Sequence, residues 1–231
     1  MKIDLYGDGV GSVSLVAHVG TDKTVVNSAR VSFGRDNKRD LVERDEKLIN
    51  YLIKHKHTST LEHNVITLMF EVPLFVRSQH MRHRTWSYNE ISRRYTDVDM
   101  KFYVPQGFRT QHESNRQASK DVLIDPIIQN DIPSFTATSL VKNHHSDSLN
   151  LFNRLLDEGV CREQARGVLP QNLYTRYYAT VNLNNLLKFI DLRLHEGAQW
   201  EIQQVAKACL EIATELWPFT VGAYREHRGE I

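Results

Sequence analysis

A segment of fourteen residues, Arg82–Tyr95, carries an unusual density of groups that could do chemistry. Five of its side chains are arginine or histidine, and they lie among one carboxylate, several hydroxyls and three aromatic rings. Guanidinium groups repel one another and are unfavourable to bury without partners, so this cluster predicts an anionic ligand. We interpret the segment as a binding loop for a phosphorylated small molecule, with a solvated basic loop as the alternative.

The side chains of this loop divide by the chemistry they offer. Planar, permanently charged guanidinium groups suit bidentate capture of phosphate oxygens or pyrimidine carbonyls. A carboxylate and a hydroxyl could position a sugar, whereas aromatic rings near a strand end are more often anchors in a core or interface. The polar set is Arg82, His83, Arg84, Glu90, Ser92 and Arg94, and the aromatic set is Trp86, Tyr88 and Tyr95.

Three other motifs are less specific. The glycines of Gly7–Gly11 lack the later glycine and the helix of a dinucleotide fingerprint, so a hairpin is predicted there. His55, His57 and His63 lack an i, i+4 pair and an evident carboxylate ligand, so no metal site is predicted. Ser59–Glu62 fits a helix capping box, and a helix N-terminus there would also suit an anionic cofactor.

Composition points to one globular domain over residues 1–231. The chain is 41% hydrophobic and 25% charged, with a net charge of +1, so affinity for anions must come from local clustering. Cys161 and Cys209 show no paired metal-ligand spacing. With no apolar leader and no run suited to a bilayer, we expect a cytoplasmic protein without a membrane partner.

Hydrophobic periodicity predicts several long helices and few strands. The expected strands are Ile3–Leu5, Ser12–Val16, Val65–Val72 and Leu173–Val181. Helices are expected over about 44–56, from Pro73 to about Met81, from about Leu140 to Gly159, over Leu186–Leu194, and from Ile202 to near Pro218. Residues around 107–131 are polar and weakly patterned, which predicts a surface insertion. This mixture, without a βαβ rhythm, predicts an α+β fold with a mixed, mainly antiparallel sheet.

The spacing of Arg82-His83-Arg84, seven residues, then Ser92 resembles the signature of the flavin-dependent thymidylate synthases. The resemblance extends over most of the chain outside the 107–131 insertion. It is carried by the segments Asn27–Phe33, His57–His63, Arg166–Pro170, Asn172–Arg176, Leu192–Arg193 and Ala198–Gln203.

This resemblance implies reductive methylation of dUMP to dTMP in thymidylate synthesis. It also implies methylenetetrahydrofolate as carbon donor, FAD as hydride carrier, NADPH as reductant, and a homotetramer whose sites are shared between subunits. Hydride transfer from the flavin to C6 would remove the need for a cysteine nucleophile, which agrees with the unremarkable contexts of both cysteines. Arg193 matches the arginine that stabilises charge on the pyrimidine and is the implied catalytic residue.

The resemblance also assigns binding residues position by position. For dUMP it implies Gln79, His80, Met81, Arg82, Glu90, Ile91, Ser92, Arg93, Arg94, Arg166 and Arg193, with Arg94 and Arg166 as phosphate clamps. For FAD it implies Ser59, Arg82, His83, Arg84, Glu90, Asn182 and Asn184, and Lys188 is added as a hypothetical pyrophosphate contact.

Three positions depart from the family pattern. Asn184 stands where relatives often carry arginine, Lys188 where asparagine is common, and Gly197 where a histidine occurs. The adenine side of the flavin site is therefore less well defined by sequence than the pyrimidine site. An inactive family member and a module for single-stranded nucleic acid remain alternatives, although near-neutral charge and one compact cluster favour a mononucleotide and no nucleic-acid partner. A polymer site would lose affinity steeply with salt.

Overall fold

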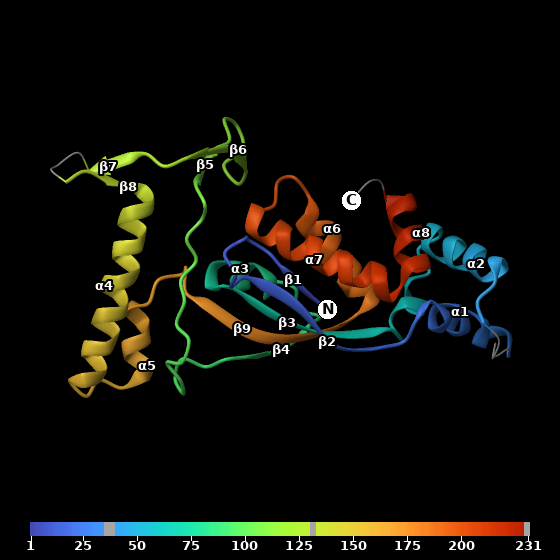
Figure 1. Ribbon diagram of the computed structural model, residues 1–231. Helices are drawn as coiled ribbons and strands as arrows, with labels where there is room; N and C mark the ends of the chain where they lie inside the picture. The colour runs from blue at the N-terminus through green and yellow to red at the C-terminus, as the bar shows by residue number, and fades with distance from the viewer. Residues whose placement is uncertain (35–39, 130–132, 229–231) are drawn as a thin grey trace.

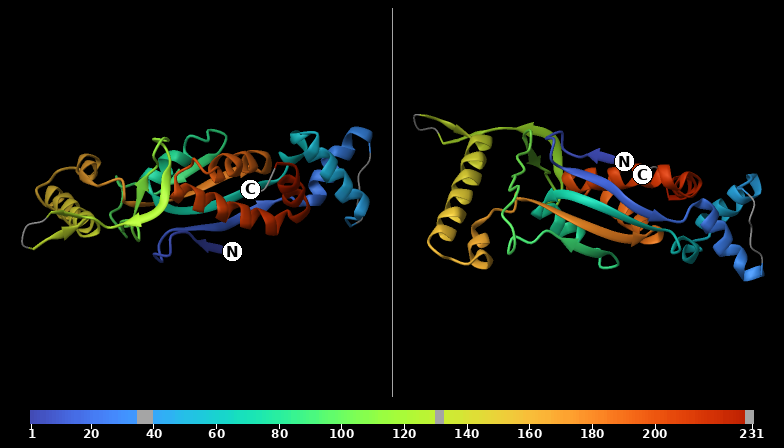
Figure 2. Two further views of the ribbon diagram at one scale, coloured as in Figure 1. Left: turned by 90° about the horizontal axis from the view of Figure 1, so that it is seen from above. Right: turned by 60° about the horizontal axis from the view of Figure 1, so that its bottom comes forward.

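The computed structural model describes residues 1–34, 40–129 and 133–228. A five-stranded sheet crosses the middle of an elongated molecule (Figure 1). At one end the long helix α4, Ala137–Asp157, stands apart from the sheet, and at the other end lie α1, Asp22–Arg30, and α2, Glu43–Lys54. The two further views show the same separation of the ends (Figure 2).

The sheet has the order β1-β2-β3-β9-β4. Its strands are β1 Lys2–Asp4, β2 Ser12–Val19, β3 Val65–Pro73, β9 Tyr174–Asn182 and β4 Ser87–Glu90. Each ladder in the described residues is antiparallel, including the central pair in which Val65 faces Asn182. The α+β prediction is confirmed, and the described sheet is wholly antiparallel where a mixed one was expected.

Helices pack on the sheet around an aromatic core. They are α3 Leu74–His80, α6 Leu183–Leu194 and α7 Trp200–Leu216, and α8 Pro218–Arg228 packs against α7 and against α1 and α2 at the end of the molecule. Phe70 on β3 stacks on Tyr177 of β9 with ring centroids 5.2 Å apart, and Phe189 of α6 is fully buried beside them. This core fixes the end of α3, from which the Arg82–Tyr95 segment departs.

The Arg82–Tyr95 segment is not wholly a loop as predicted. Its middle forms the edge strand β4, in which Ser87 faces Thr180 and Glu90 faces Tyr177 on β9. Ser87 and Asn89 are exposed while Tyr88 and Glu90 are half-buried, which is the alternation of a strand with one covered face. Two loops therefore remain, one on each side of a short strand.

The polar insertion also contains strands. Phe108–Gln111 (β5) pairs with Ser119–Ile124 (β6), and Ile127–Gln129 (β7) pairs with Phe135–Thr136 (β8) before α4 begins. Residues 112–128 are mostly exposed, and residues 130–131 of the predicted insertion lie outside the described part of the chain. The segment is thus built mainly of short hairpins.

Three local features differ from the sequence-based expectations. The predicted capping box at Ser59–Glu62 is instead part of a short 3₁₀ turn, Thr58–Leu61, that begins after His57 without a side-chain cap. Neither α1 nor α8 was expected. Pro218 ends α7 but also begins α8, because proline suits the first turn of a helix. The remaining short helices are Val31–Phe33, α5 at Arg162–Ala165, and Arg166–Val168.

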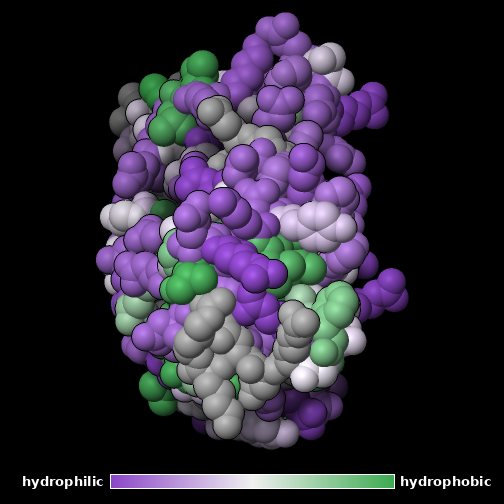
Figure 3. Space-filling view, turned by 90° about the vertical axis from the view of Figure 1, so that its right-hand side faces the viewer, coloured by the Kyte–Doolittle hydropathy of each residue, from purple (hydrophilic) through white to green (hydrophobic). Residues whose placement is uncertain are grey.

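The end of the molecule formed by α1, α2 and α8 presents a mainly hydrophilic face with small apolar patches (Figure 3). Among the described residues, no helix combines the length and apolar character needed to cross a bilayer. The same residues contain no group of three or more His, Cys, Asp and Glu side chains placed to hold a metal ion.

Candidate functional site

Strand β4 divides the predicted binding residues into two groups. Arg82–Arg84 precede it at the end of α3, and Glu90–Arg94 close it on the other side. We call the cavity beside the second set the Glu90 pocket, and the contacts of Arg193, His83 and Gln79 the Arg193 group.

The Glu90 pocket has a volume of about 460 Å³, within the range of small-molecule sites. Five of the predicted nucleotide residues line it together with residues of α3, β9 and the turn after α5. The lining residues are Leu74, Arg77, Glu90, Ile91, Ser92, Arg93, Arg166, Gly167, Leu169, Gln171, Leu173, Tyr174 and Thr175.

Two side chains hold the carboxylate of Glu90. Arg77 on α3 donates to Oε2 of Glu90 from Nε at 3.0 Å and from Nη2 at 2.5 Å. The hydroxyl of Thr175 on β9 donates to the other oxygen, Oε1, at 2.7 Å. Because both carboxylate oxygens are engaged and the pair is only partly exposed, the orientation of Glu90 at the pocket wall is fixed.

The two predicted phosphate clamps meet at Glu163. Nη2 of Arg94 lies 3.2 Å from the Glu163 carboxylate, and Nε of Arg166 donates to the Glu163 carbonyl at 3.3 Å. All three residues are exposed, so the ion pair is weak and open to exchange for another anion. Arg93 instead donates from Nη1 to the carbonyl of Val98 at 2.7 Å, which ties down the loop after Ser92.

The Arg193 group joins the second set of residues. Nε of Arg193 donates to Nε2 of His83 at 3.0 Å, and its Nη2 donates to the carbonyl of Gln79 at 2.9 Å. The amide of Gln79 in turn donates to Gln199 at 2.5 Å. A half-buried guanidinium is thereby held in one orientation at the end of α3, with positive charge available to a neighbouring ligand.

His83 accepts from Arg193, so its imidazole must be neutral at Nε2. Burial, and then the charge of Arg193, lower the pKa of His83 to about 4. His80 is different, because its side chain is fully buried and its Nδ1 lies 2.8 Å from the hydroxyl of Tyr177. Met81 also packs against the core. His80 can therefore support a nucleotide site through its packing and backbone, not through its ring.

The predicted flavin residues lie along α6, on the Thr58–Leu61 turn and in the loop before β4. Arg82 and Arg84 are exposed, and neither guanidinium has a hydrogen bond or ion pair to another described residue. Ser59 and Lys188 are exposed as well. Exposed cations and hydroxyls of this kind suit an anionic group such as a pyrophosphate.

Two asparagines of the flavin set already have structural partners. Asn182 caps α6 by accepting from the backbone of Asn185 at 2.9 Å. Asn184 is buried and donates to the carboxylate of Glu62 at 2.9 Å. Asn184, one of the departures from the family pattern, thus connects α6 to the segment that carries Ser59.

A third departure, Gly197, has a local physical reason. Its backbone N–H donates to Nδ1 of His195 at 3.0 Å, and a Cβ at position 197 would meet that nitrogen at 3.2 Å. A side chain at this position would crowd the bond that shapes the turn between α6 and α7.

Sequence reasoning missed three residues of the site, Arg77, Thr175 and Gln199. Arg77 lies two positions before Gln79, but its partner Glu90 is thirteen positions away, and only the pairing of β4 with β9 brings them together. Thr175 lies within a segment that resembles the family, yet nothing in the sequence indicates that its hydroxyl reaches Glu90.

Known proteins of one family are similar to this protein over nearly the whole chain. The family profile described as thymidylate synthase complementing protein matches residues 14–219. A flavin-dependent thymidylate synthase of Thermus thermophilus is 42% identical over 217 residues, 94% of this chain and 76% of the relative. One from Thermosipho melanesiensis is 39% identical over 96% of this chain and 94% of its own.

Solved structures extend the agreement to the fold. The UMP/dUMP methylase PolB from Streptomyces cacaoi, determined with 5-Br dUMP, superposes with a TM-score of 0.78. It is 32% identical, and the match covers 97% of each chain. The arginine-rich loop, the antiparallel sheet and these relatives together establish that the chain belongs to the flavin-dependent thymidylate synthase family.

Proposed function

We propose that this protein catalyses the reductive methylation of dUMP to dTMP. FAD would carry the hydride, NADPH would reduce the flavin, and methylenetetrahydrofolate would supply the carbon. Membership in the flavin-dependent thymidylate synthase family supports the reaction class. The observation that carries the proposal to particular residues is the Arg193 group, in which a guanidinium is fixed by His83 and Gln79.

Arg193 supplies what methylation at C5 of uracil requires. When hydride adds at C6, negative charge develops on the pyrimidine ring and its carbonyl oxygens. A guanidinium already oriented by His83 and by the Gln79 carbonyl can stabilise that charge without reorganising. The neutral state of His83 matters here, since a protonated imidazole could not accept from Arg193.

The Glu90 pocket would hold the sugar and phosphate. Glu90 presents a carboxylate fixed by Arg77 and Thr175, and Ser92 adds a hydroxyl on the same wall. Arg94 and Arg166 would exchange their contacts with Glu163 for the phosphate of dUMP, because a dianion pairs with two arginines more strongly than one exposed carboxylate does.

The residues assigned to FAD fit an anionic cofactor. Arg82 and Arg84 present exposed guanidinium groups without partners among the described residues, and Lys188 and Ser59 are exposed near the start of α6. The bound flavin would supply hydride to C6 of the pyrimidine. These residues would hold its phosphates and orient its ring toward the nucleotide.

The cysteines agree with a route that uses no thiolate. Cys209 is fully buried in α7, and burial raises its pKa, so it stays protonated. Cys161 is exposed at the start of α5 and is not among the residues that line the Glu90 pocket. Neither side chain is among the residues assigned to dUMP.

The experiment is dTMP formation by the purified protein with FAD, NADPH, methylenetetrahydrofolate and dUMP, with UMP in parallel because PolB is named for both nucleotides. Arg193→Ala should lose about 100-fold or more of the rate, as expected for removing an oriented charge, and should still retain flavin after desalting. Arg44→Gln on α2 is the matched control. Turnover of Arg193→Ala at the wild-type rate would contradict the role of Arg193.

A homotetramer with shared sites is part of the proposal. Its support is that the Arg193 group and the Glu90 pocket take their residues from opposite ends of β4 in one chain. If the two serve one nucleotide from different subunits, co-expressing the inactive variants Arg193→Ala and Arg94→Ala should restore part of the activity. If both serve it from the same subunit, the mixed protein should stay inactive.

A further inference from the structure

A second cavity, which we call the hairpin pocket, lies between the β5–β6 hairpin and the start of α7. Its volume is about 330 Å³, and its wall combines aromatic rings with two arginines and several amides. The lining residues are Tyr6, Tyr103, Pro105, Gln106, Gly107, Phe108, Arg109, Gln111, Arg116, Gln117, Ala118, Ser119, Leu123, Gln199, Trp200 and Glu201. None of the residues assigned to dUMP or FAD lines it.

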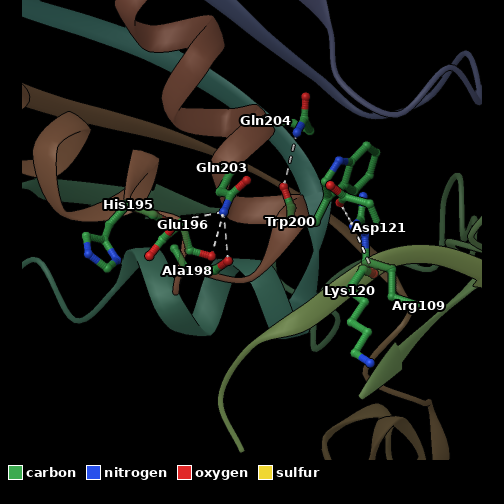
Figure 4. Close-up of polar contacts among 9 residues, drawn as sticks. All are labelled: Arg109, Lys120, Asp121, His195, Glu196, Ala198, Trp200, Gln203 and Gln204. Carbon is green, nitrogen blue, oxygen red and sulfur yellow. Dashed lines mark hydrogen bonds and ion pairs between the residues drawn. The ribbon is translucent and has the colours of Figure 1, made fainter. Parts of the chain in front are cut away.

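The rings of the hairpin pocket suit a flat ligand. Tyr6 lies 5.1 Å from Tyr103 and 6.0 Å from Trp200, measured between ring centroids. The guanidinium carbon of Arg109 lies 5.1 Å from the centroid of Trp200, so the guanidinium makes a cation–π contact with this ring of the wall. Figure 4 shows Arg109 and Asp121 of the hairpin beside Trp200 at the start of α7.

The lining offers two guanidinium groups to an acid, one of which, that of Arg109, is also paired with Asp121. Arg109 and Arg116 carry two positive charges, and Glu201, which accepts from the hydroxyl of Tyr103 at 3.2 Å, is the acidic residue of the lining. Among described residues, both hydrogen bonds of the Arg109 guanidinium, to Asp121 and to the Lys120 carbonyl, come from Nη1. Donors on Nε and Nη2 therefore stay available to a carboxylate.

The turn that leads into Gln199 and Trp200 of the lining is preformed. The amide nitrogen of Gln203 donates to the carbonyls of His195 at 3.2 Å and Ala198 at 2.9 Å, which fixes the turn that precedes Trp200 (Figure 4). A ligand that binds against Gln199 and Trp200 does not have to order the turn that precedes them, so less conformational entropy is lost on binding.

The pocket is also joined to the Arg193 group. Gln199 lines the hairpin pocket, and its side-chain oxygen accepts from Gln79 at 2.5 Å. Gln79 accepts in turn from Arg193 through its carbonyl. A ligand in the hairpin pocket therefore lies next to residues assigned to the reaction, which is the place for part of a co-substrate.

We propose that the hairpin pocket binds the aminobenzoyl-glutamate part of the folate co-substrate. The flat aminobenzoyl ring would lie among Tyr6, Tyr103 and Trp200, and the glutamate carboxylates would pair with Arg109 and Arg116. This assignment rests on the proposed function, since it presumes a folate, and it gives the polar insertion a role in substrate binding.

Binding can be measured without turnover, by calorimetric titration of the purified protein with 4-aminobenzoyl-L-glutamate. The dissociation constant should rise about tenfold in Arg109→Gln and in Arg116→Gln, as expected for the loss of one charge-assisted hydrogen bond. Arg116 is exposed, so its variant tests the pocket even if Arg109→Gln folds poorly. Arg44→Gln, at the far end of the molecule on α2, should bind like the wild type.

Two results of the titration would overturn the assignment. One is the absence of binding to the wild type, and the other is an equal loss of affinity in Arg44→Gln, which would indicate a general effect of charge. 4-Aminobenzamide, which keeps the ring and the amide but has no carboxylate, should bind more weakly and be insensitive to Arg116→Gln. Sensitivity equal to that of the full probe would exclude the proposed pairing with the glutamate carboxylates.

Kinetics separates this inference from the proposed function. In Arg116→Gln the KM for methylenetetrahydrofolate should rise about tenfold while the KM for dUMP and the retained flavin stay unchanged. Absence of dTMP formation by the wild type would refute the proposed function itself. Normal dTMP formation with an unchanged folate KM would refute only the assignment of the hairpin pocket.

Discussion

The contact between His83 and Arg193 predicts how stability depends on pH. Burial and the charge of Arg193 lower the pKa of His83 to about 4, from an ordinary value of 6.5. Between these two values the unfolded chain binds a proton at His83 and the folded chain does not, so acidification favours unfolding. The stability associated with neutral His83 is complete above pH 6.5 and is lost progressively as pH falls toward 4.

The size of this effect follows from the same pKa difference. Each unit between the unfolded and folded pKa values corresponds to about 1.4 kcal/mol. Because the ring is only half-buried, solvent screening reduces the expected total to about 1–2 kcal/mol. For a chain of this length that corresponds to a change in Tm of about 2–8 °C.

The assay is the free energy of unfolding by urea, measured from neutral pH down to about pH 4 for the wild type and His83→Gln. Glutamine keeps an acceptor for Arg193 but does not titrate. The wild type should lose about 1–2 kcal/mol more than the variant on acidification. His80 is present in both proteins, and burial, the largest cause of its lowered pKa, is common to both. Parallel curves for the two proteins would refute the account of His83.

Two further variants test contacts that the sequence does not reveal. Arg77→Gln removes the charge that fixes Glu90, so the KM for dUMP should rise about tenfold with little change in kcat. Arg77→Lys should recover part of the affinity. An unchanged KM in Arg77→Gln would exclude a positioning role for Arg77. Tyr177→Phe leaves Nδ1 of buried His80 without its partner and should destabilise the fold by about 1–3 kcal/mol in urea unfolding, whereas Tyr178→Phe at an exposed position should change little. Equal stability of the two tyrosine variants would contradict the second expectation.

Long, strongly patterned elements were predictable from sequence. The apolar residues of β3 and the helical spacing in α6 and α7 reflect burial along a single face. The spacing of apolar residues within each segment is therefore enough to predict these elements. Helix α1 was missed because its stability is not local. Its buried Asp22 accepts from the hydroxyl and backbone of Thr220 on α8, nearly two hundred residues later.

The site was predictable in its residue types and less so in its contacts. The resemblance to a known family identified the arginines, but it gave no reason to expect that Glu163 contacts both Arg94 and Arg166. The role of Arg77 depends on the pairing of β4 with β9. A short edge strand is hard to predict because its pairing partner is remote in the chain.

The spacing within the arginine-rich segment follows from this strand. Arg77 and Gln79 lie two positions apart on α3, and residues so spaced on a helix face different directions. The side chain of Arg77 therefore contacts Glu90, while that of Gln79 contacts Gln199. Strand β4 spans about 13 Å between the two regions. Since side chains alternate along a strand, inserting or deleting one residue in β4 would turn Glu90 away from Arg77. The number of residues between His83 and Glu90 therefore constrains the site more tightly than the identity of the exposed residues between them.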